Sequence, residues 1–568
     1  MKLAGGEIVC EALIEEGVDL VFGIPGGAIL PFYDQILKYP QIKHVLMRHE
    51  QGAAHAADGY ARATGKVGVC IATSGPGALN LLSGLGTAFM DSTPMVAITG
   101  QVTRPAIGKD AFQETDITGA SIPIIKHSYL VTDTQDIPRI MKEAFFIART
   151  GRPGPVLVDI PRDVLQEVVE YTGYPKAVNL PGYKPRVEGN MPQIRRAAQL
   201  INEAKKPVIL AGRGVLVAHA ENELKDLAEK AQIPVICSLL GLGAFPGTHP
   251  LSLSLMGMHG SAFANLAVDE CDVLINIGSR FDDRILGRVK DFAPRAQIIH
   301  VNIDPSAINQ NIQVHVPVVG DAKAVLEDML PLVHPARHDE WLKKMELLKK
   351  EHPLVVRNFD QTPSTQYVIK KIYEETQGKS LLVTGVGQHQ MWAAQHYLAD
   401  EPNSFMTSGG LGTMGYEVPA AIGVQMGRPD RMVWSICGDA GFQMTLQELA
   451  VVRDEKLPIK YAIMNNGHHG MVRQWQTLFY GKRYSAIVTT GPDFVKLAEA
   501  YSIKGIRVTN KSDVAAAIRE ANATDGPVLV DFLVEVSEHV FPMIPSGQSV
   551  KEMMEDSVPD ALIEEARR

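Results

Sequence analysis

Cysteine is scarce in this sequence, and the few cysteines present do not suggest a covalent framework. Cys10, Cys70, Cys237, Cys271 and Cys437 are the only cysteines among 568 residues, and no two form a C-x-x-C pair. Most of them lie inside apolar runs. Neither a disulfide framework nor a zinc site is therefore expected, and the cysteines are predicted to be reduced core residues of an intracellular protein.

Long apolar runs and basic clusters are also missing. No apolar run reaches the ~18 residues that a membrane-spanning helix needs. The N-terminus, M-K-L-A-G-G-E-I-V-C-E-A-L, has acidic residues and an amphipathic helical pattern in place of a signal peptide. The formal net charge is 55 − 64 = −9, which argues against a nucleic-acid surface. We expect a cytoplasmic protein that binds neither membranes nor nucleic acids.

Short apolar segments alternate with helical segments along almost the whole chain. Continuous apolar strands separated by helices are typical of parallel sheets that are covered on both faces. The predicted strands include 67–73, 95–99, 155–160, 207–211, 273–277, 381–384, 432–437, 459–464 and 528–532. This pattern predicts an α/β protein built from doubly wound parallel sheets.

Two stretches indicate domain boundaries in a chain that is too long for one core. Residues 171–192 are rich in proline, glycine and charge, and residues 339–352 form a charged helical segment. We therefore predict three α/β domains, at 1–170, 190–335 and 360–535, followed by a tail at 536–568.

The third predicted domain contains the most specific motif. One predicted strand runs into G-D-A-G, which includes Asp439, and the next strand ends at N-N, which includes Asn466, 466 − 439 = 27 residues later. Parallel neighbouring strands would bring both residues to the carboxyl edge of the sheet, where ligands of open α/β folds bind. Glycine turns and helix N-termini suit phosphate, and the oxygen ligands suit Mg²⁺. Taken alone, G-D-x-G could also be a plain strand–turn–helix with a capping Asp.

This motif resembles the magnesium–diphosphate motif of thiamine-diphosphate enzymes. The resemblance implies a glutamate in the first domain that hydrogen-bonds the aminopyrimidine ring of the cofactor. Glu50, in R-H-E-Q-G-A-A-H, matches it. Burial of such a carboxyl would raise its pKa and help it to exchange a proton near neutral pH. The alternative is an acid favoured only by the helix dipole.

Further motifs resemble the catalytic subunit of acetohydroxyacid synthase, also called acetolactate synthase. In family order they are G-I-P-G-G-A, A-T-S-G-P-G-A-L-N, D-A-F-Q-E, R-P-G-P-V-L-V-D-I-P, M-G-M-H-G, G-S-R-F-D-D-R, G-Q-H-Q-M-W-A-A-Q, S-G-G-L-G-T-M-G-Y and G-M-V-R-Q-W-Q. The family decarboxylates pyruvate on thiamine diphosphate and ligates the hydroxyethyl unit to pyruvate or 2-ketobutyrate. The products, 2-acetolactate and 2-aceto-2-hydroxybutyrate, lead to valine, leucine and isoleucine. The three domains would then bind the thiamine pyrimidine, FAD, and the diphosphate with Mg²⁺.

The resemblance implies a set of thiamine-diphosphate contacts and a magnesium site. Mg²⁺ would be held by Asp439, the side chain of Asn466 and the backbone carbonyl of His468. Met414 would hold the cofactor bent, although it could be an ordinary core methionine. His389 could instead be a capping or core residue. Beside Glu50, the implied contacts are Gln388, His389, Gly412, Met414, Gly438, Asp439, Ala440, Gly441, Asn466, His468, Gly470 and Met471.

The resemblance also implies a substrate pocket with residues from two subunits. Gly27 and Ala28 would face the reacting carbon, and Phe112 and Gln113 would form a wall supplied by the partner subunit. Trp475 would favour 2-ketobutyrate as acceptor, and Arg284 would attract its carboxylate. The alternatives are that Trp475 belongs to an apolar helix stripe with Met471 and Phe479, and that Arg284 is a solvated surface residue.

The middle domain matches the family's FAD-binding positions, where the flavin is structural. The implied contacts are Arg152, Gly212, Ser238, Leu239, Met258, His259, Gly278, Arg280, Asp282 and Asp321. Asn302 stands where an acidic ribose contact is expected, which leaves that contact in doubt. Other departures from the family pattern are Arg162 for lysine, Glu417 for a small residue, Ala440 for glycine and His468-His469 for an aromatic–leucine pair.

Alternative functions remain open at this point. They are a catabolic acetolactate synthase without FAD, a flavoenzyme of the pyruvate-oxidase type and a non-catalytic cofactor-binding scaffold. In the resembled family Glu50 and the metal motif meet across a subunit interface, so a homodimer or homotetramer is expected. A separate regulatory small subunit is also a possible partner.

Overall fold

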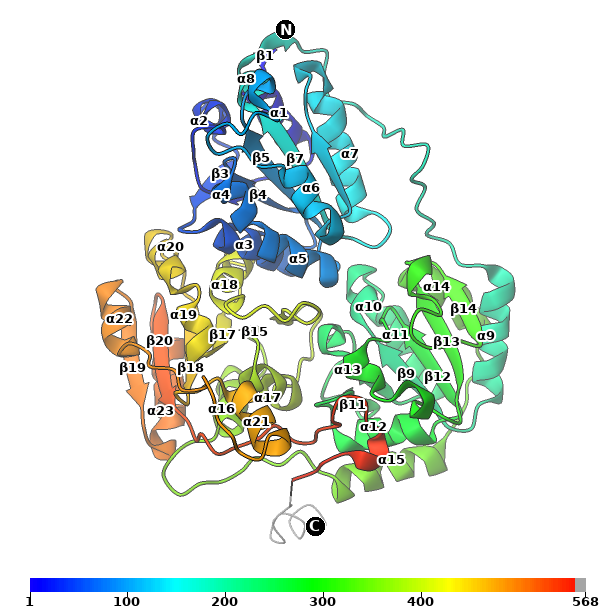
Figure 1. Ribbon diagram of the computed structural model, residues 1–568. Helices are drawn as coiled ribbons and strands as arrows, with labels where there is room; N and C mark the ends of the chain where they lie inside the picture. Colours follow the sequence, from blue (N-terminus) through cyan, green and yellow to red (C-terminus); the bar gives the residue numbers. More distant parts are fainter. Residues whose placement is uncertain (557–568) are drawn as a thin grey trace.

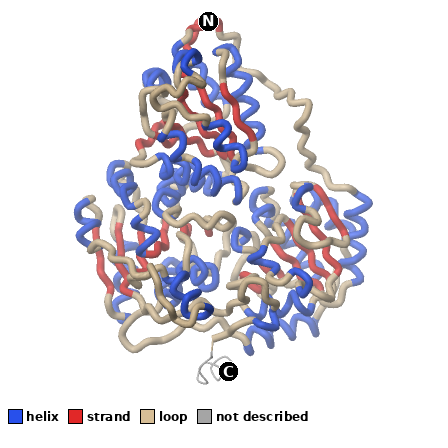
Figure 2. Tube along the Cα trace, in the orientation of Figure 1, coloured by secondary structure: helices blue, strands red, loops and turns tan. Residues whose placement is uncertain are grey.

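The computed structural model describes residues 1–556 and consists of three α/β domains, each built on a six-stranded parallel sheet. The first domain lies at the top of Figure 1, the middle domain at lower right and the third at lower left. Helices cover both faces of each sheet (Figure 2). The predicted fold class is confirmed.

The first domain has strand order β3-β2-β4-β5-β7-β6. Its strands are β2 (Leu20–Gly23), β3 (Lys43–Leu46), β4 (Gly68–Ala72), β5 (Met95–Gln101), β6 (His127–Leu130) and β7 (Pro155–Pro161), with an added antiparallel pair of β1 (Lys2–Ala4) and β8 (Val168–Glu170). Its helices are α1 (Gly5–Glu15), α2 (Leu30–Ile36), α3 (Glu50–Thr64), α4 (Pro76–Asn80), α5 (Leu82–Met90), α6 (Ile117–Ser121), α7 (Ile137–Arg149) and α8 (Arg162–Gln166).

The middle domain has strand order β11-β10-β9-β12-β13-β14. Its strands are β9 (Pro207–Ala211), β10 (Val235–Cys237), β11 (Ser252–Leu255), β12 (Val273–Ile277), β13 (Gln297–Asn302) and β14 (Val316–Val319). Its helices are α9 (Met191–Glu203), α10 (Arg213–Val217), α11 (Glu221–Ala231), α12 (Ala262–Glu270), α13 (Asp283–Leu286), α14 (Ala322–Met329) and α15 (Asp339–Glu351).

The third domain has strand order β16-β15-β17-β18-β20-β19, which repeats the arrangement of the first domain. Its strands are β15 (Leu381–Thr384), β16 (Phe405–Thr407), β17 (Val433–Gly438), β18 (Lys460–Asn465), β19 (Lys504–Val508) and β20 (Val528–Leu533). Its helices are α16 (Thr365–Thr376), α17 (Gln388–His396), α18 (Glu417–Gly427), α19 (Asp439–Gln443), α20 (Leu449–Asp454), α21 (Gly470–Phe479), α22 (Phe494–Ala500) and α23 (Val514–Ala523).

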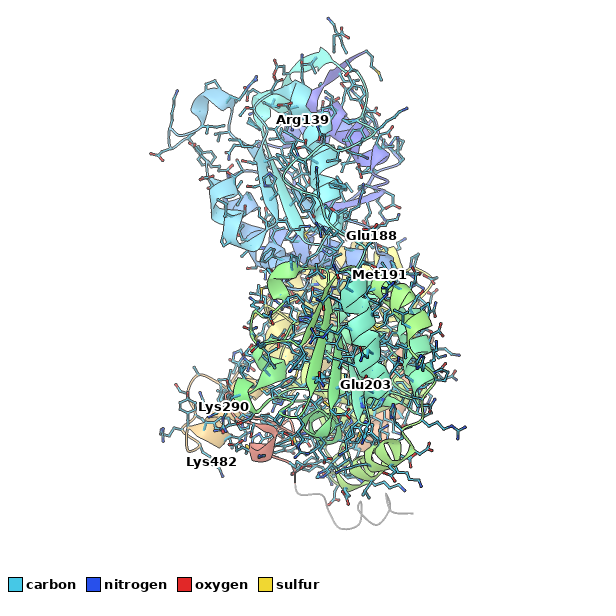
Figure 3. All side chains as sticks on the ribbon, turned by 90° about the vertical axis from the view of Figure 1, so that its right-hand side faces the viewer. Arg139, Glu188, Met191, Glu203, Lys290 and Lys482 are labelled. Carbon is cyan, nitrogen blue, oxygen red and sulfur yellow. The ribbon has the colours of Figure 1, made fainter. Side chains whose placement is uncertain are left out.

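The nine strands predicted from apolar runs are confirmed, each within two residues at either end. Residues 171–190, inside the predicted proline-rich boundary, contain no helix or strand and link the first domain to α9. Figure 3 labels Glu188 at the end of this linker, and Met191 and Glu203 at the two ends of α9. The charged boundary segment forms α15. Of the predicted tail, residues 557–568 lie outside the described residues.

Helices α3 and α18 join the first domain to the third and lie against each other between the two sheets (Figure 1). Small residues allow their close approach. A Cβ on Gly59 would lie 2.2 Å from the backbone oxygen of Ala420, and one on Gly423 would lie 1.8 Å from that of Ala56. The positions of Glu50 and Met414 therefore depend on a tightly packed helix pair.

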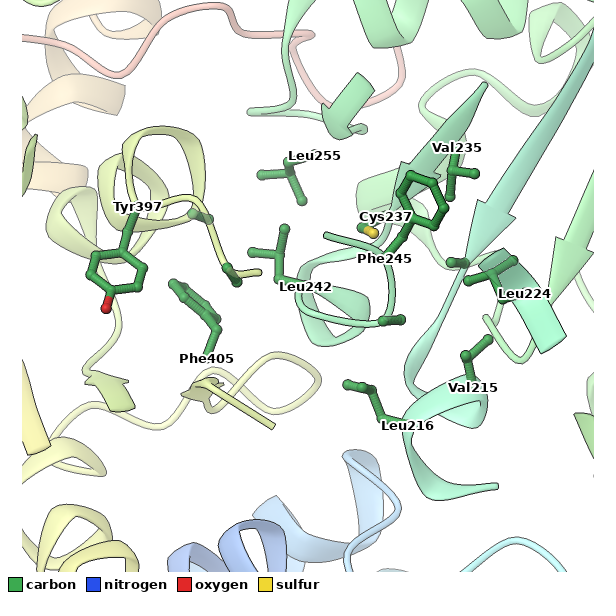
Figure 4. Close-up of a cluster of buried hydrophobic side chains, with 14 of the residues drawn as sticks. Val215, Leu216, Leu224, Val235, Cys237, Leu242, Phe245, Leu255, Tyr397 and Phe405 are labelled. Carbon is green, nitrogen blue, oxygen red and sulfur yellow. The ribbon is translucent and has the colours of Figure 1, made fainter. Parts of the chain in front are cut away.

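The middle and third domains share a buried apolar core (Figure 4). Val235, Leu242 and Phe245 from the middle domain pack in one cluster with Tyr397 and Phe405 from the third. The segment after β20 crosses back to the middle domain, where the Ile544 N–H donates to the Met258 oxygen at 2.8 Å. Within residues 1–556, no helix has the length and apolar character needed to span a membrane.

Candidate active site

The carboxyl edge of the third sheet carries most of the predicted cofactor residues. Three neighbouring strands, β15, β17 and β18, lead into loops from which helices start. Gln388 begins α17, Asp439 begins α19 and Gly470 begins α21, while Asn466 directly follows β18. The N-terminal ends of these helices provide free backbone N–H groups, which attract an anion.

Asp439 is a buried carboxylate at this edge, with 3% of its surface exposed. The hydroxyl of Thr489 donates to its Oδ2 at 2.7 Å. Burial raises the pKa of Asp439, and the Thr489 hydroxyl and the backbone N–H of Asn466 counteract part of that rise. Asp439 and Asn466 are thus brought together, as the spacing of their strands predicted.

The His468 ring is turned onto the Asn466 backbone. Its Nδ1 lies 2.8 Å from the carbonyl oxygen of Asn466, and its backbone N–H donates to Asn466 Oδ1 at 3.0 Å. Across residues 1–556, no three His, Cys, Asp or Glu side chains converge as a metal site would require. A metal here would have one carboxylate plus amide and carbonyl oxygens, a donor set that fits Mg²⁺ alongside phosphate.

A cradle of glycines lies beside Asp439. A Cβ on Gly438 would lie 2.8 Å from the His389 ring, and one on Gly470 would lie 2.2 Å from Gln388 Oε1. His389 is buried, which lowers its pKa to about 4 and keeps its ring neutral. Its Nε2 has no hydrogen-bond partner among the described residues. The two glycines thus let the side chains of His389 and Gln388 approach the backbone beside Asp439, and the uncharged His389 ring keeps one nitrogen free for a ligand such as a diphosphate group.

A cavity of about 860 Å³ lies between the domains, next to this cradle. Gly412, Met414, Met471, Trp475 and Arg284 are on its wall. Nine of the ten predicted FAD contacts also line it, namely Arg152, Ser238, Leu239, Met258, His259, Gly278, Arg280, Asp282 and Asp321. Gly212 does not, because it packs against Ser279, whose Cα a Cβ on Gly212 would approach to 2.4 Å. The volume is near the upper end for a ligand pocket.

Helix α21 carries Met471, Trp475 and Phe479, for which the sequence allows two interpretations, a pocket wall or an ordinary apolar stripe. Met471 and Trp475 line the cavity, and Phe479 is 41% exposed, with its ring centroid 5.0 Å from that of Trp475. Gln474 is the buried residue of this helix. Two of the three stripe residues therefore line the cavity, and none of the three is fully buried. Arg284 is 61% exposed in its side chain and borders the same cavity.

Arg213 is a cavity residue that the sequence did not single out, although it directly follows Gly212, one of the predicted FAD contacts. Burial and the nearby Arg62 lower its pKa to about 10. Its Nε is buried without a hydrogen-bond partner within the described chain. A guanidinium with unused donors next to an open cavity suits an anionic ligand.

Asn302 and Asp304 both line the cavity. The Asn302 Nδ2 donates to the Ser279 oxygen at 3.2 Å, and Asp304 Oδ2 lies 3.5 Å from Arg152 Nη1. The acid that is missing at position 302 is therefore present two residues later. Only the structure reveals this, because β13 ends at Asn302 and the loop that follows it turns Asp304 into the cavity.

The carboxyl edge of the first sheet forms a second cluster. Glu50 begins α3, and its Oε2 accepts from Asn80 Nδ2 at 2.9 Å. The Ala28 N–H donates to the Thr73 hydroxyl at 3.3 Å, and a Cβ on Gly75 would lie 2.7 Å from the Gln113 oxygen. These contacts hold Glu50, the Gly27-Ala28 loop and Gln113 at one edge. Phe112 is 88% exposed at the same loop.

The two clusters are separate within one chain. Glu50, Gly27, Ala28, Phe112 and Gln113 are not on the wall of the large cavity. Asp58, 58 − 50 = 8 residues along α3 and so roughly 12 Å from Glu50 along its axis, is the residue that bonds the Tyr416 hydroxyl at 2.7 Å. Tyr416 is two residues after Met414, so the loop that carries Met414 is attached to the far half of α3.

Of the residues that depart from the family pattern, Glu417 is buried and Arg162 is exposed. Glu417 begins α18, is fully buried, and neither carboxylate oxygen has a hydrogen-bond partner among the described residues. Burial raises its pKa to about 7. Arg162 begins α8 and is exposed.

Comparison of the chain with models of known protein families shows the class of enzyme to which it belongs. Residues 3–120, 194–329 and 385–532 match the N-terminal, central and C-terminal domains of thiamine pyrophosphate enzymes, respectively. Each matched region includes strands of one of the three sheets. The chain is therefore a thiamine-pyrophosphate-dependent enzyme.

Individual relatives narrow the class. A protein of Mycobacterium bovis named acetolactate synthase is 48% identical, covering 97% of this chain and 91% of its own length. Large subunits of acetolactate synthase from Corynebacterium glutamicum, 48% identical over 96% of this chain and 89% of its own, and from Cyanidium caldarium, 45% identical over 97% and 96%, are similar. The chain belongs to the acetolactate synthase large-subunit family.

Proposed function

We propose that this protein joins the two-carbon fragment of one pyruvate to a second 2-keto acid, using thiamine diphosphate, Mg²⁺ and a structural FAD. With pyruvate as acceptor the product is 2-acetolactate, and with 2-ketobutyrate it is 2-aceto-2-hydroxybutyrate, with one CO₂ released per product. The observation that carries this proposal is the convergence of three helix starts, Asp439 and Asn466 beside a cavity lined by Met414 and Trp475.

The diphosphate and Mg²⁺ would bind at the carboxyl edge of the third sheet. The N-terminal ends of the three helices and the unpartnered Nε2 of His389 fit a phosphate group. Asp439, the Asn466 side chain and the His468 carbonyl would hold the metal, whose charge offsets that of the diphosphate. When bound, thiamine diphosphate would supply a carbon nucleophile that adds to the keto group of pyruvate, and a cationic ring that takes up the electron pair left when CO₂ departs.

Glu50 and Met414 would prepare this chemistry. Glu50 would hold a proton at its carboxyl and exchange it with the aminopyrimidine ring of the cofactor. Met414 would press that ring toward the thiazolium, fixing the geometry in which the exchange occurs. Gly27 and Ala28, without bulky side chains, would leave space for the substrate beside Glu50.

Trp475 and Arg284 would select the acceptor. Trp475 lies on the cavity wall, where its ring can contact the extra methyl group of 2-ketobutyrate. Such a contact is worth about 1–3 kcal/mol, or roughly 10- to 200-fold in selectivity. Arg284 also borders the cavity and would bind the acceptor carboxylate.

FAD would occupy the cavity between the middle and third domains. The wall offers guanidinium groups, including Arg152 and Arg213, for a diphosphate, and carboxylates, including Asp304, for ribose hydroxyl groups. Apart from Arg152, which precedes β7 of the first domain, the predicted FAD residues come from loops that follow strands of the middle sheet. These features support a bound dinucleotide, and the proposed reaction would transfer no electrons to it.

A dimer would complete the site. Glu50 and Met414 belong to separate clusters of one chain, so a second copy would bring its Glu50 edge over the Met414 loop. Apolar side chains are exposed on both clusters, with Phe112 at 88%, Leu411 at 49% and Met444 at 49%. Relatives from Corynebacterium glutamicum and Cyanidium caldarium are named large subunits, which supports a separate small subunit as a further partner.

The test is a product assay on the purified protein. The protein is incubated with equal concentrations of pyruvate and 2-ketobutyrate, thiamine diphosphate and Mg²⁺, and both acetohydroxy acids are measured. We expect both products, with 2-aceto-2-hydroxybutyrate in excess, from a protein that is yellow after purification.

Other outcomes identify the alternatives. A colourless protein that forms only acetolactate without added flavin would be the FAD-free enzyme. Consumption of pyruvate together with oxygen or a quinone, and without acetohydroxy acids, would indicate the pyruvate-oxidase type. Either result would overturn the proposal.

A further inference from the structure

Asp91 is a buried carboxylate of the first domain that holds a loop of the third. It follows α5, and its side chain is fully buried. Its Oδ1 accepts from the Gly410 N–H at 2.6 Å, and its Oδ2 accepts from the Gly409 N–H at 3.1 Å. Both glycines are at the start of loop 408–416, which joins β16 to α18 and contains Gly412 and Met414.

Arg62 of α3 extends this contact to the N-terminal end of the loop. Its Nη2 donates to Asp91 Oδ2 at 2.8 Å, and its Nη1 donates to the Thr407 carbonyl oxygen at 2.8 Å. Its side chain is 1% exposed. Arg62 therefore fixes the last residue of β16, just before the loop, while orienting the carboxylate that fixes Gly409 and Gly410.

Asp58 holds the C-terminal end of the loop. It accepts from the Tyr416 hydroxyl at 2.7 Å and from Arg62 Nη2 at 3.2 Å. Between the two ends, the hydroxyls of Thr87 and Thr413 are hydrogen-bonded at 2.8 Å. The loop is thus attached to α3 and α5 at its start, at the residue before Met414, and at its end.

A buried ionic network of this kind is weak evidence for stability, because the loss of hydration offsets much of the attraction. Its distinctive property is fixed geometry, since charge-assisted hydrogen bonds are short and directional. The contacted loop borders the large cavity, and none of the hydrogen bonds of the network described above involves the Met414 side chain. The network can therefore act on Met414 only through the backbone of the loop.

We propose that Asp91 is a positioning residue that, with Arg62 and Asp58, locks loop 408–416 and so holds Met414 at the reaction centre. The inference rests on the proposed function only for the role of Met414. Asp91 also lines the large cavity, but both of its carboxylate oxygens already accept hydrogen bonds from the loop N–H groups and from Arg62. Its carboxylate acts through two consecutive backbone N–H groups.

The first test measures the loop directly, by hydrogen–deuterium exchange of the full chain without added substrate. In Asp91→Asn the carboxamide keeps one acceptor oxygen and loses the charge that binds Arg62. We expect exchange at Gly409 and Gly410 to become about tenfold faster or more, because charge-assisted hydrogen bonds are lost. A matched control is Asp272→Asn, since Asp272 likewise accepts from two consecutive N–H groups, of Lys205 and Lys206, at 2.7 and 2.9 Å.

The second test is steady-state kinetics with saturating thiamine diphosphate and Mg²⁺. We expect kcat of Asp91→Asn to fall by roughly 10- to 100-fold, because small displacements of a positioning group have effects of this size. KM for pyruvate should stay within about twofold, since the substrate pocket is unchanged. Asp272→Asn should leave kcat and the exchange of residues 409–410 as in the wild type.

Each outcome decides the proposal. Unchanged exchange at Gly409 and Gly410, or faster exchange with unchanged kcat, would overturn it. If Asp91→Asn does not fold, the isosteric Thr87→Val removes the contact next to Met414, and the same pair of results is required at Thr413. A wild-type protein that forms no acetohydroxy acid would refute the proposed function, while the exchange measurements would still report on the loop.

Discussion

At the scale of the residue, the proposed Mg²⁺ site would depend on Asn466 in N-N-G-H-H-G and not on the rings of the two histidines that follow it. The His468 ring bonds back to Asn466 through Nδ1. The Asn466 Oδ1 accepts from the His468 backbone, so the turn orients the amide without any need for the ring. Asp439 and Asn466 follow adjacent strands.

We therefore expect His468→Ala to bind Mg²⁺ within about threefold of the wild type, because its carbonyl is retained. Asn466→Ala, the matched variant, should weaken Mg²⁺ binding by about tenfold or more, since a ligand side chain is lost. The measurement is the Mg²⁺ concentration that half-saturates binding of thiamine diphosphate, followed by calorimetry. Equal losses in the two variants would mean that the imidazole ring is a ligand.

The sequence alone predicted some residues of the proposed cofactor site, but it did not predict the residues that surround them. Asp439 and Asn466 could be found because strand ends in a parallel sheet meet at one edge. Arg213, Asp91 and Asp304 could not, because their importance depends on loops from different domains that meet around one cavity. The spacing of residues along the chain does not predict which loops of different domains come into contact.

At the scale of the element, α18 begins with an acid whose charge is disfavoured. Glu417 is fully buried, and burial raises its pKa from 4.5 to about 7. Between these values the folded state holds the proton more tightly than the unfolded state, so this residue's contribution to stability falls as pH rises from about 4.5 to 7. Above pH 7 the cost is roughly 3 kcal/mol, because each pKa unit corresponds to about 1.4 kcal/mol.

Glu417→Gln should therefore raise the melting temperature at pH 8 and change it little at pH 4.5, where the acid is protonated in the folded state. Differential scanning calorimetry at the two pH values measures this directly. Glu340→Gln, at an exposed position on α15, is the control and should have no effect at either pH. A lower melting temperature of Glu417→Gln at pH 8 would show that the ionised carboxylate stabilises the fold.

The elements themselves were largely predictable, because buried parallel strands are continuous apolar runs. The segments 207–211, 273–277 and 381–384 match β9, β12 and β15 residue for residue. The close crossing of α3 and α18 was not predictable. It depends on Gly59 and Gly423 facing backbone atoms of a helix more than 350 residues distant in the sequence.

At the scale of the whole molecule, the separation of the two clusters makes a dimer testable by complementation. Glu50→Gln and Asp439→Asn should each abolish turnover while leaving the fold intact. Mixed after subunit exchange, half of the dimers would contain one chain of each kind, and each of these would have one site with both native residues. We expect about one quarter of the wild-type activity to return in a product assay.

No recovery after proven exchange of subunits would place both residues in a site within one chain. Two preparations of Glu50→Gln mixed with each other are the control and should stay inactive.

In such a dimer, helix α3 would contribute residues to two reaction centres. In the proposed dimer, its first residue serves the site completed by the partner, while Asp58 and Arg62 steady the loop of its own chain's site. Because α3 is one continuous helix of 15 residues, a displacement of one of its ends would also displace the other. A single substitution in α3 would thus change the geometry of both reaction centres. Ligand binding at one centre could change the geometry of the other through the same helix.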